Sequence, residues 1–392
     1  MTRWPDPFIR NEREAAIADR ADRLASLFAE RAAKHDLEGS FPFENFEDLR
    51  EAGYLKLTVP ELYGGEEASA YELVLSQERL ARGDGSTALA VGWHVHMLMQ
   101  LRLARHWPEP LFAKLCKDIV EEGALINEFA SEPATGSPTR GGRPETTAIR
   151  TEGGWRLTGR KTFSTLSPIV KQFVVSAGIE GSEKVGSFLV RTGPGVQVEE
   201  TWNTMGMRAT GSHDVVLNDV FVPDEETIRG LEQPAAGVPA VPTEATMLHI
   251  PACYIGIAYA ARDFALAFAR KHKPNSLTVP IAELPNVKRQ LGLIETDLIA
   301  ARSFLYQIAD RWDKEPEQRA ALRPELGLAK YIATNSALRI VDQAMRIVGG
   351  LSLSRNHPLE RMYRDVRAGL HNPPMDDVVL TNLANRAIGE AE

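Results

Sequence analysis

The stretch that decides the fold of this chain runs from Gly206 to Pro223 and reads GMRATGSHDVVLNDVFVP. Its first half is a glycine-rich turn. Its second half carries the apolar and β-branched residues Val215 and Leu217, and it predicts a strand that Pro223 ends. The segment lies near the middle of a chain of 392 residues, which is long enough for two or three domains.

Helical and β patterns alternate around this segment. In the first third, apolar residues recur at helical spacing, and helices are expected over 17–38, 43–53, 71–82, 86–106 and 111–120. From Gly123 to Pro223 the period is mostly two, with frequent glycine and proline, which is typical of a small β-barrel or sandwich. A connector rich in Pro, Gly and Ala spans 230–242, and helical spacing returns over 287–312, 329–348 and 378–388.

This order predicts a multidomain α+β protein. The expected parts are an N-terminal helical domain over residues 1–122, a central β-barrel or sandwich over 123–236, and a C-terminal four-helix bundle over 237–392.

Composition excludes several classes of function. The net charge of −8 is spread along the chain, which argues against binding nucleic acid. No apolar run approaches the roughly 18–20 residues of a membrane span, and the polar N-terminus is not a signal peptide. Two isolated cysteines favour the cytoplasm and give no zinc site. No metal is expected at His94 and His96 either, because residues two apart in a helix point about 200° apart.

The Gly206–Pro223 segment resembles the signature that acyl-CoA dehydrogenases carry near the end of their β-domain. Four further segments resemble landmarks of that family, and they occur in the family's order: residues 49–65, 130–137 (ASEPATGS), 157–165 (LTGRKTFST) and 348–365. The resemblance implies an FAD-dependent oxidoreductase that acts on the CH–CH group of an acyl thioester such as an acyl-CoA. It also implies a homotetramer that passes electrons to an electron-transfer flavoprotein.

The resemblance assigns residues to the flavin. Donors near the flavin ring matter because the reduced ring carries negative charge that fixed N–H and O–H groups stabilise. Phe163 stands where the family usually has a tryptophan packed on the ring, and Ser137 matches a serine between flavin and substrate. Arg346 stands where it could pair with the pyrophosphate. The other matching positions are Ala130, Ser131, Ser164 and Thr165 at the ring and Gly349 and Gly350 at the adenosine.

The catalytic base of the family is missing from its usual place. In most members a glutamate follows the Arg-Asp landmark by about eight residues, but here the loop reads Leu370-His371-Asn372-Pro373-Pro374, with Pro373 at the glutamate's position. A proline cannot accept a proton. Glu244, near the helix after the β-domain, is the alternative base.

The Leu-His-Asn-Pro loop more closely resembles a side branch of flavin-dependent monooxygenases in the same superfamily. Those proteins use reduced flavin and oxygen, so FMN could replace FAD, and a flavin reductase would be the partner. They carry a histidine in this loop, which implies a catalytic role for His371 beside Asn372. They carry another in the helix that holds His94 and His96, which implies a substrate-binding role there. A third hypothesis is a flavin-fold binding protein without catalysis, against which the retained Ser131, Ser137 and Thr165 argue.

Overall fold

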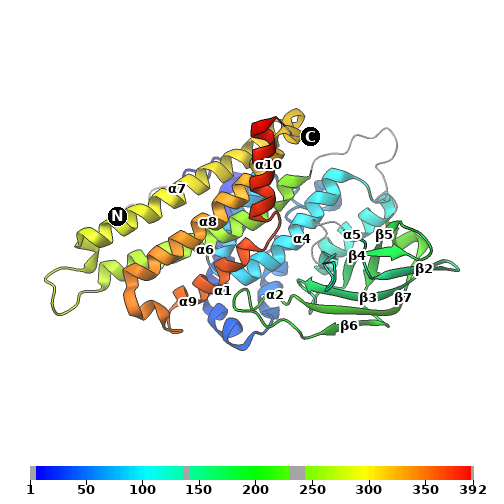
Figure 1. Cartoon of the computed structure of the whole chain (residues 1–392), viewed down its shortest axis with the longest axis horizontal. Coiled ribbons are helices and arrows are strands. Elements are labelled where there is room, and N and C mark those ends of the chain that lie inside the picture. The colour runs from blue at the N-terminus through cyan, green and yellow to red at the C-terminus, as the bar shows by residue number, and fades with distance from the viewer. Residues whose placement is uncertain (1–5, 136–141, 229–242, 390–392) are drawn as a thin grey trace.

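The computed structural model describes residues 6–135, 142–228 and 243–389. In these ranges two helical parts lie beside one β-sheet, with the sheet at one end of the molecule (Figure 1). Ser137 and the predicted domain boundary at 236/237 lie outside the described residues. The boundary at 122/123 falls between the last N-terminal helix and the first strand.

The N-terminal part is helical, as its periodicity predicts. Its α-helices are α1 (Glu12–Glu38), α2 (Phe43–Glu51), α3 (Ala70–Ala81), α4 (Gly85–Ala104) and α5 (Glu109–Glu122). Helix α1 begins where the Asn11 side chain accepts the amide of Glu14, and it ends at Gly39, whose φ of 66° is left-handed. Helix α3 begins with a capping box between Ser69 and Glu72.

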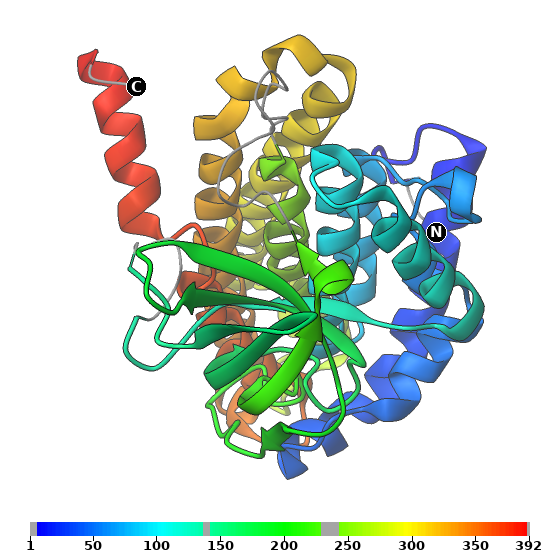
Figure 2. The ribbon, with the colours of Figure 1, turned by 90° about the vertical axis from the view of Figure 1, so that its right-hand side faces the viewer.

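One sheet of eight strands forms the described central part. The strands are β1 (Ile126–Phe129), β2 (Thr147–Thr151), β3 (Gly154–Ser164), β4 (Gln172–Ile179), β5 (Val185–Arg191), β6 (Val196–Glu199), β7 (His213–Pro223) and β8 (Thr227–Ile228). Their order is β6-β7-β3-β2-β4-β5-β8, and β1 pairs with β4 in parallel. Strand β7 is the predicted strand of the signature, and it pairs antiparallel with β3. The sheet lies in front of the helices in Figure 2.

The C-terminal part returns to helices. These are α6 (His249–Lys271), α7 (Pro285–Lys314), α8 (Arg323–Val348), α9 (Pro358–Asp365) and α10 (Asp376–Ile388). Helices α6, α7 and α8 pack on one another, and α3 packs on α6, so the two helical parts share one core. Helix α10 stands apart and touches α8 (Figure 2). The predicted helical, β, helical fold is confirmed.

Helix α6 is more apolar than the sequence analysis allowed. The stretch Glu244–Lys271 is long and apolar enough to cross a bilayer by length and composition, because it contains an 18-residue window with a mean hydropathy of 1.2. Within this window 56% is buried inside the protein, as in a core helix. The expectation that no segment reaches this threshold was therefore too strict.

A buried ion pair joins three elements of the sheet. Lys161 of β3 is fully buried and donates to Glu132 Oε1 at 2.5 Å and to the Ser176 carbonyl of β4 at 2.7 Å. Glu132 follows β1 and also accepts from Thr146. Burial alone would raise the pKa of Glu132, but the hydrogen bond from Lys161 holds it below its usual value. The pair fixes the segment after β1 against β3.

Breaking this pair is expected to cost the fold several kcal/mol. In Lys161→Met the Glu132 carboxylate stays buried without its counter-ion, and the free energy of unfolding should fall by about 3–5 kcal/mol. Arg156→Met, which removes an exposed ion pair to Asp219 at 3.2 Å, is the control and should cost less than about 1 kcal/mol. Urea unfolding measures both. If both variants lose the same small amount of unfolding free energy, the buried pair contributes little to stability.

Candidate active site

The residues predicted at the flavin ring come from two neighbouring segments. Ala130 and Ser131 follow β1, while Phe163 and Ser164 end β3 with Thr165 just beyond. The Ser131 carbonyl accepts the Thr162 amide at 2.9 Å, which holds the two segments together. The structure thus brings Ser131 beside the residues that end β3.

A row of hydroxyls continues from Thr165 into the signature segment. Thr165 Oγ1 lies 2.8 Å from Ser212 Oγ, which lies 2.8 Å from Thr210 Oγ1. Asn127 of β1 donates to the Thr165 carbonyl at 2.9 Å. The sequence analysis did not name Thr210 or Ser212 as site residues, although both lie in the segment on which it was based. Their hydroxyls extend the polar edge of the site.

Phe163 has an unusual backbone and an exposed ring. Its φ is +53°, in the left-handed region that non-glycine residues rarely adopt, and its side chain is 68% exposed. Trp202 meets the ring edge-on at a centroid distance of 5.8 Å. Strain at an exposed aromatic residue points to a functional role.

Ser164 carries an orphaned polar atom. Its Oγ is buried and has no hydrogen-bond partner among the described residues. An exposed apolar ring, an unpaired hydroxyl and a row of further hydroxyls fit a flat ring system with polar edges. A flavin has that chemistry, so the residues present fit the cofactor that the resemblance implies.

The signature turn is wedged between the sheet and both helical parts. The Met207 amide donates to Asp365 Oδ1 at 2.6 Å, and Arg364 of α9 donates to the Met205 carbonyl at 2.7 Å. Gly206 is required there, because a Cβ would lie 2.4 Å from the Arg364 carbonyl oxygen. Arg364 also bonds Asp36 of α1. The Arg-Asp landmark therefore has a structural role in holding this turn.

Asp365 is a buried carboxyl group with Arg361, Asp84 and Asp36 near it. It is 2% exposed, and burial raises its pKa to about 7, although Arg361 and the Met207 amide oppose the rise. Near neutral pH a large fraction of the molecules would hold it protonated.

The loop in which the resemblance places the family's base is formed by a short turn and two prolines. His371 is exposed, and its amide donates to the Ala368 carbonyl at 3.0 Å. Asn372 Oδ1 accepts from the buried Tyr254 hydroxyl at 2.5 Å. Burial raises the pKa of Tyr254 well above its usual value, so the phenol keeps its proton and acts as the donor. Asn372 is therefore fixed to α6, and His371 is free to meet a ligand.

Glu244 lies at the start of the short helix before α6. Its Oε1 pairs with Arg323 Nε at 2.5 Å, while its Oε2 is buried and lacks a partner among the described residues. Arg323 therefore holds one oxygen of the carboxylate and leaves the other free.

The two histidines of α4 have different surroundings. His94 Nδ1 accepts the Ile126 amide at 3.1 Å, and its Nε2 lies 2.9 Å from the Leu55 carbonyl, so both ring nitrogens are bonded to backbone. Burial lowers the pKa of His94 to about 4. His96 instead stacks on His249 at a centroid distance of 5.1 Å, and its Nδ1 has no partner in the described ranges. The sequence analysis missed His249, which lies more than 150 residues from its neighbour.

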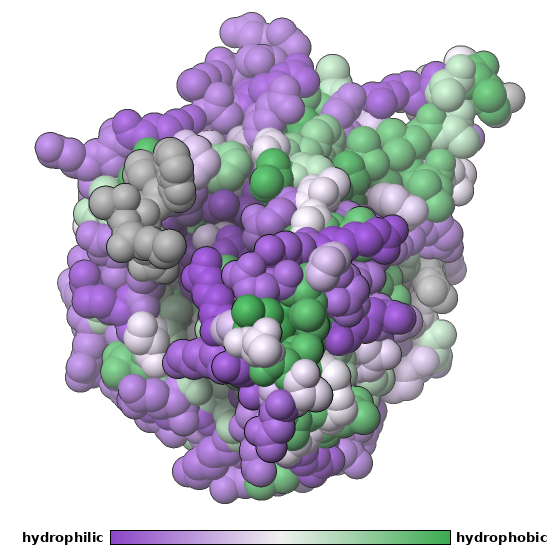
Figure 3. Space-filling model, turned by 90° about the vertical axis from the view of Figure 1, so that its left-hand side faces the viewer, coloured by the Kyte–Doolittle hydropathy of each residue, from purple (hydrophilic) through white to green (hydrophobic). Residues whose placement is uncertain are grey.

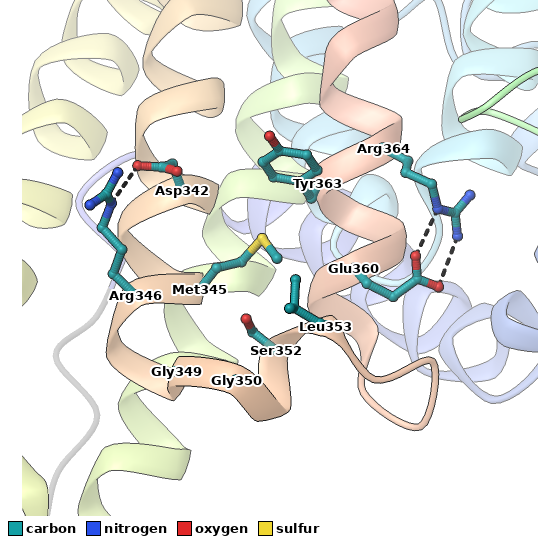
Figure 4. Close-up of a pocket in the computed structure, with 10 residues that line it drawn as sticks. All are labelled: Asp342, Met345, Arg346, Gly349, Gly350, Ser352, Leu353, Glu360, Tyr363 and Arg364. Atoms are coloured by element: carbon teal, nitrogen blue, oxygen red, sulfur yellow. Dashed lines mark hydrogen bonds and ion pairs between the residues drawn. The ribbon is translucent and has the colours of Figure 1, made fainter.

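The residues predicted at the adenosine and pyrophosphate lie in a separate pocket. This pocket, of about 590 Å³, lies where α8 ends against α9, away from the sheet, and it includes Arg346, Gly349 and Gly350 (Figure 4). Arg346 is largely exposed and donates to Asp342 at 2.7 Å. A Cβ on either glycine would meet nothing within 4 Å, so a ligand could approach the backbone closely.

No cluster of three or more His, Cys, Asp or Glu side chains that could hold a metal occurs in the part of the chain that the structure describes.

A sheet packed beside two helical parts, with an exposed aromatic ring beside a row of hydroxyls, fits a three-domain flavoprotein. Sequence comparison agrees with this class. Residues 11–107, 128–220 and 245–370 match the N-terminal, middle and C-terminal domains of acyl-CoA dehydrogenase. The chain belongs to the acyl-CoA dehydrogenase family.

Its relatives include proteins with different reactions. YdbM of Bacillus subtilis (strain 168) is 48% identical over 97% of this chain and 98% of its own length. The amino sugar nitrososynthase RubN8 of Streptomyces rubradiris is 31% identical over 90% of this chain and 84% of its own. The solved structure of KijD3 with FMN and dTDP-3-amino-2,3,6-trideoxy-4-keto-3-methyl-D-glucose has a TM-score of 0.84 and 26% identity, covering 97% of this chain and 95% of KijD3. These relatives are consistent with a flavin cofactor.

Asp365→Asn is expected to change how stability depends on pH. Because the folded-state pKa is about 7 and the ordinary value 3.8, the stability that depends on protonated Asp365 is complete below pH 4 and is lost as the pH rises towards 7. The amide keeps an acceptor for Met207 and cannot ionise. At pH 8 the variant should therefore be more stable than the wild type, by at most about 4 kcal/mol.

Thermal unfolding from pH 4 to 8 measures this effect. Asp263→Asn, at a half-exposed carboxylate on α6, is the control and should leave the pH profile of the wild type unchanged. A profile of Asp365→Asn parallel to that of the wild type would contradict the assignment.

Proposed function

We propose that this chain is a cytoplasmic flavin-dependent monooxygenase that receives reduced flavin from a separate flavin reductase. The observation that carries this proposal is the loop after α9, where Pro373 stands at the place of the dehydrogenases' glutamate. The carboxylates on either side of the loop are engaged: Asp365 with the Met207 amide, and Asp376 with Lys330 and Asn335. Oxygenation needs no carboxylate that removes a proton next to a thioester.

A bound reduced flavin would supply two electrons to oxygen, of which one atom enters the substrate and the other leaves as water. The chain's own residues then have distinct tasks. Phe163 covers the ring, and Ser131, Ser164 and Thr165 offer polar groups to its edge. His371 gives or takes a proton in the reaction, and Asn372, fixed by Tyr254, holds the loop in position.

Two relatives support a reaction other than the dehydrogenation of an acyl thioester. RubN8 is named an amino sugar nitrososynthase, and KijD3 was solved with FMN and an amino sugar nucleotide. For the same reason FMN is a candidate cofactor beside FAD.

The pocket at Arg346, Gly349 and Gly350 is proposed to hold the nucleotide end of a flavin bound to a neighbouring copy, as expected for a homotetramer. Phe163 belongs to β3, whereas the pocket is lined by residues of α8 and α9 and of the segment between them, and these helices lie away from the sheet in Figure 1. We therefore propose that one copy does not complete both ends of the site by itself. Nearby, Leu351 and Leu353 are 50% and 73% exposed. The end of the molecule opposite the sheet shows apolar patches between hydrophilic ones, as an assembly surface would (Figure 3).

A second candidate function is dehydrogenation of an acyl thioester, with an electron-transfer flavoprotein as partner. The unpartnered Oε2 of Glu244 favours it, because that atom could take the α-proton of the substrate. The 48% identity to YdbM, which is provisionally named an acyl-CoA dehydrogenase, also favours it.

One experiment separates the two functions. The flavin released from the purified protein is identified, and the oxidised protein is then mixed without oxygen with acyl-CoAs of several chain lengths while the flavin absorbance is recorded. We expect no bleaching. Bleaching that is lost in Glu244→Gln and kept in Glu283→Gln, an exposed control, would establish the dehydrogenase and contradict the proposal.

His371→Ala tests the role of the loop. Without the imidazole, oxygen-dependent product formation with a flavin reductase present should fall by about 10²–10⁴-fold, while flavin content stays the same. His357→Ala, at a histidine outside the proposed site, is the control. Unchanged turnover in His371→Ala would remove this residue from the mechanism.

A further inference from the structure

A buried polar cluster lies where α3, α4 and α6 meet. It consists of Gln77, Trp93, His96 and His249 around Gly92. Trp93 meets His249 and His96 edge-on at centroid distances of 4.9 and 5.6 Å. A Cβ on Gly92 would lie 2.6 Å from His249 Cδ2 and 3.3 Å from Gln77 Oε1, so these two side chains converge on the glycine.

The hydrogen bonds of the cluster fix which atoms are acceptors. The Thr246 carbonyl lies 3.1 Å from Nδ1 of His249, whereas His96 Nδ1 is buried and unpaired among the described residues. A carbonyl only accepts, so His249 carries its proton on Nδ1 and holds a lone pair on Nε2. Burial lowers the pKa of His96 to about 4 and that of His249 well below its usual value, so neither ring carries a second proton. In the tautomer with its proton on Nε2, His96 also holds a lone pair on Nδ1.

Gln77 adds a third acceptor. Its Nε2 donates to the Tyr54 hydroxyl at 3.1 Å, which leaves Oε1 as the free end of the amide. Within the described residues His96 Nδ1, His249 Nε2 and Gln77 Oε1 are all buried and without a partner. Unpaired buried acceptors each cost about 1–3 kcal/mol, so three in one cluster point to a ligand that donates to them.

The ring geometry argues against a metal ion. The planes of His96 and His249 are inclined by 28° and stacked. The lone pairs lie in these nearly parallel planes, so they do not converge on one ion at the roughly 2.0–2.1 Å that imidazole ligands require. A group with separate N–H or O–H bonds can reach both nitrogens from about 3 Å.

From this geometry we propose that Gln77, His96 and His249 form the polar end of the substrate site, which receives a group with at least two N–H or O–H donors. Such a group is a primary amine or a pair of neighbouring hydroxyls. Trp93 is partly exposed and forms the wall through which the group is reached. This inference rests on the proposed function in one respect, which is that the bound ligand is the substrate of the enzyme.

The test compares probes that differ only in their donors. Binding of cyclohexylamine and of 1,2-cyclohexanediol to the full-length oxidised protein is measured by tryptophan fluorescence and thermal shift. The matched controls have the same ring with fewer donors: N,N-dimethylcyclohexylamine keeps one N–H as a cation, and 1,2-dimethoxycyclohexane has none. At least one donor probe should bind about 10-fold or more tightly than its methylated control. Whether the amine or the diol shows the preference tells which donor the site takes.

Variants assign the preference to the cluster. In His249→Phe the ring remains and the acceptor is lost, so the preference should fall towards parity, while His357→Phe should keep it. Gln77→Met is the second variant should His249→Phe fold poorly. Equal binding of donor and methylated probes, or binding of neither, would overturn the proposal and leave a sealed structural cluster. Because no reductant or oxygen enters this assay, a failed oxygenation test does not affect its result.

Discussion

The bond from the Met207 amide to the buried carboxyl of Asp365 is the constraint on which the rest of the structure depends. It ties the signature turn to α9, and Arg364 beside it ties the same turn to α1 through Asp36. Only a glycine at position 206 lets the two backbones approach so closely. Thr210 and Ser212 follow within five residues, so the same bond sets where the hydroxyl row lies relative to the helices. A raised pKa at Asp365 is a consequence of enclosing a carboxyl group at a three-way junction.

Under the proposed function, the site has one half that would face the cofactor and another that would face the substrate. The proposed cofactor half has an aromatic ring at Phe163, hydroxyls at Ser164 and Thr165, and the buried Lys161–Glu132 pair that holds the segments together. The proposed substrate half has Pro373 where the resemblance places the dehydrogenases' glutamate, and it contains imidazoles. A scaffold that positions a flavin can thus serve more than one reaction, because the reaction is decided by the few groups that touch the substrate.

Periodicity and turn chemistry made the fold predictable. Alternating apolar residues gave the sheet, and helical spacing gave the two helical parts, since both patterns are local. The position of residues 163–165 at the end of a strand was predictable from the segment 157–165, while their contact with a flavin ring stays a prediction. Contacts between distant segments could not be predicted from the sequence. His96 and His249 meet because α4 packs on α6, and the sequence around each histidine gives no sign of this contact. For the same reason the sequence could not distinguish His94, whose nitrogens both bond backbone, from His96.

The most direct measurement of the central claim is the fate of electrons on the reduced protein. The flavin is reduced in the absence of oxygen, and its reoxidation is followed in stopped flow, with oxygen or with an electron-transfer flavoprotein as the acceptor. If the retained scaffold serves oxygenation, reoxidation by oxygen is the faster of the two, and bound acyl-CoA does not slow it. Slow reoxidation by oxygen together with rapid electron transfer to the electron-transfer flavoprotein would contradict the account and indicate that the protein is a dehydrogenase.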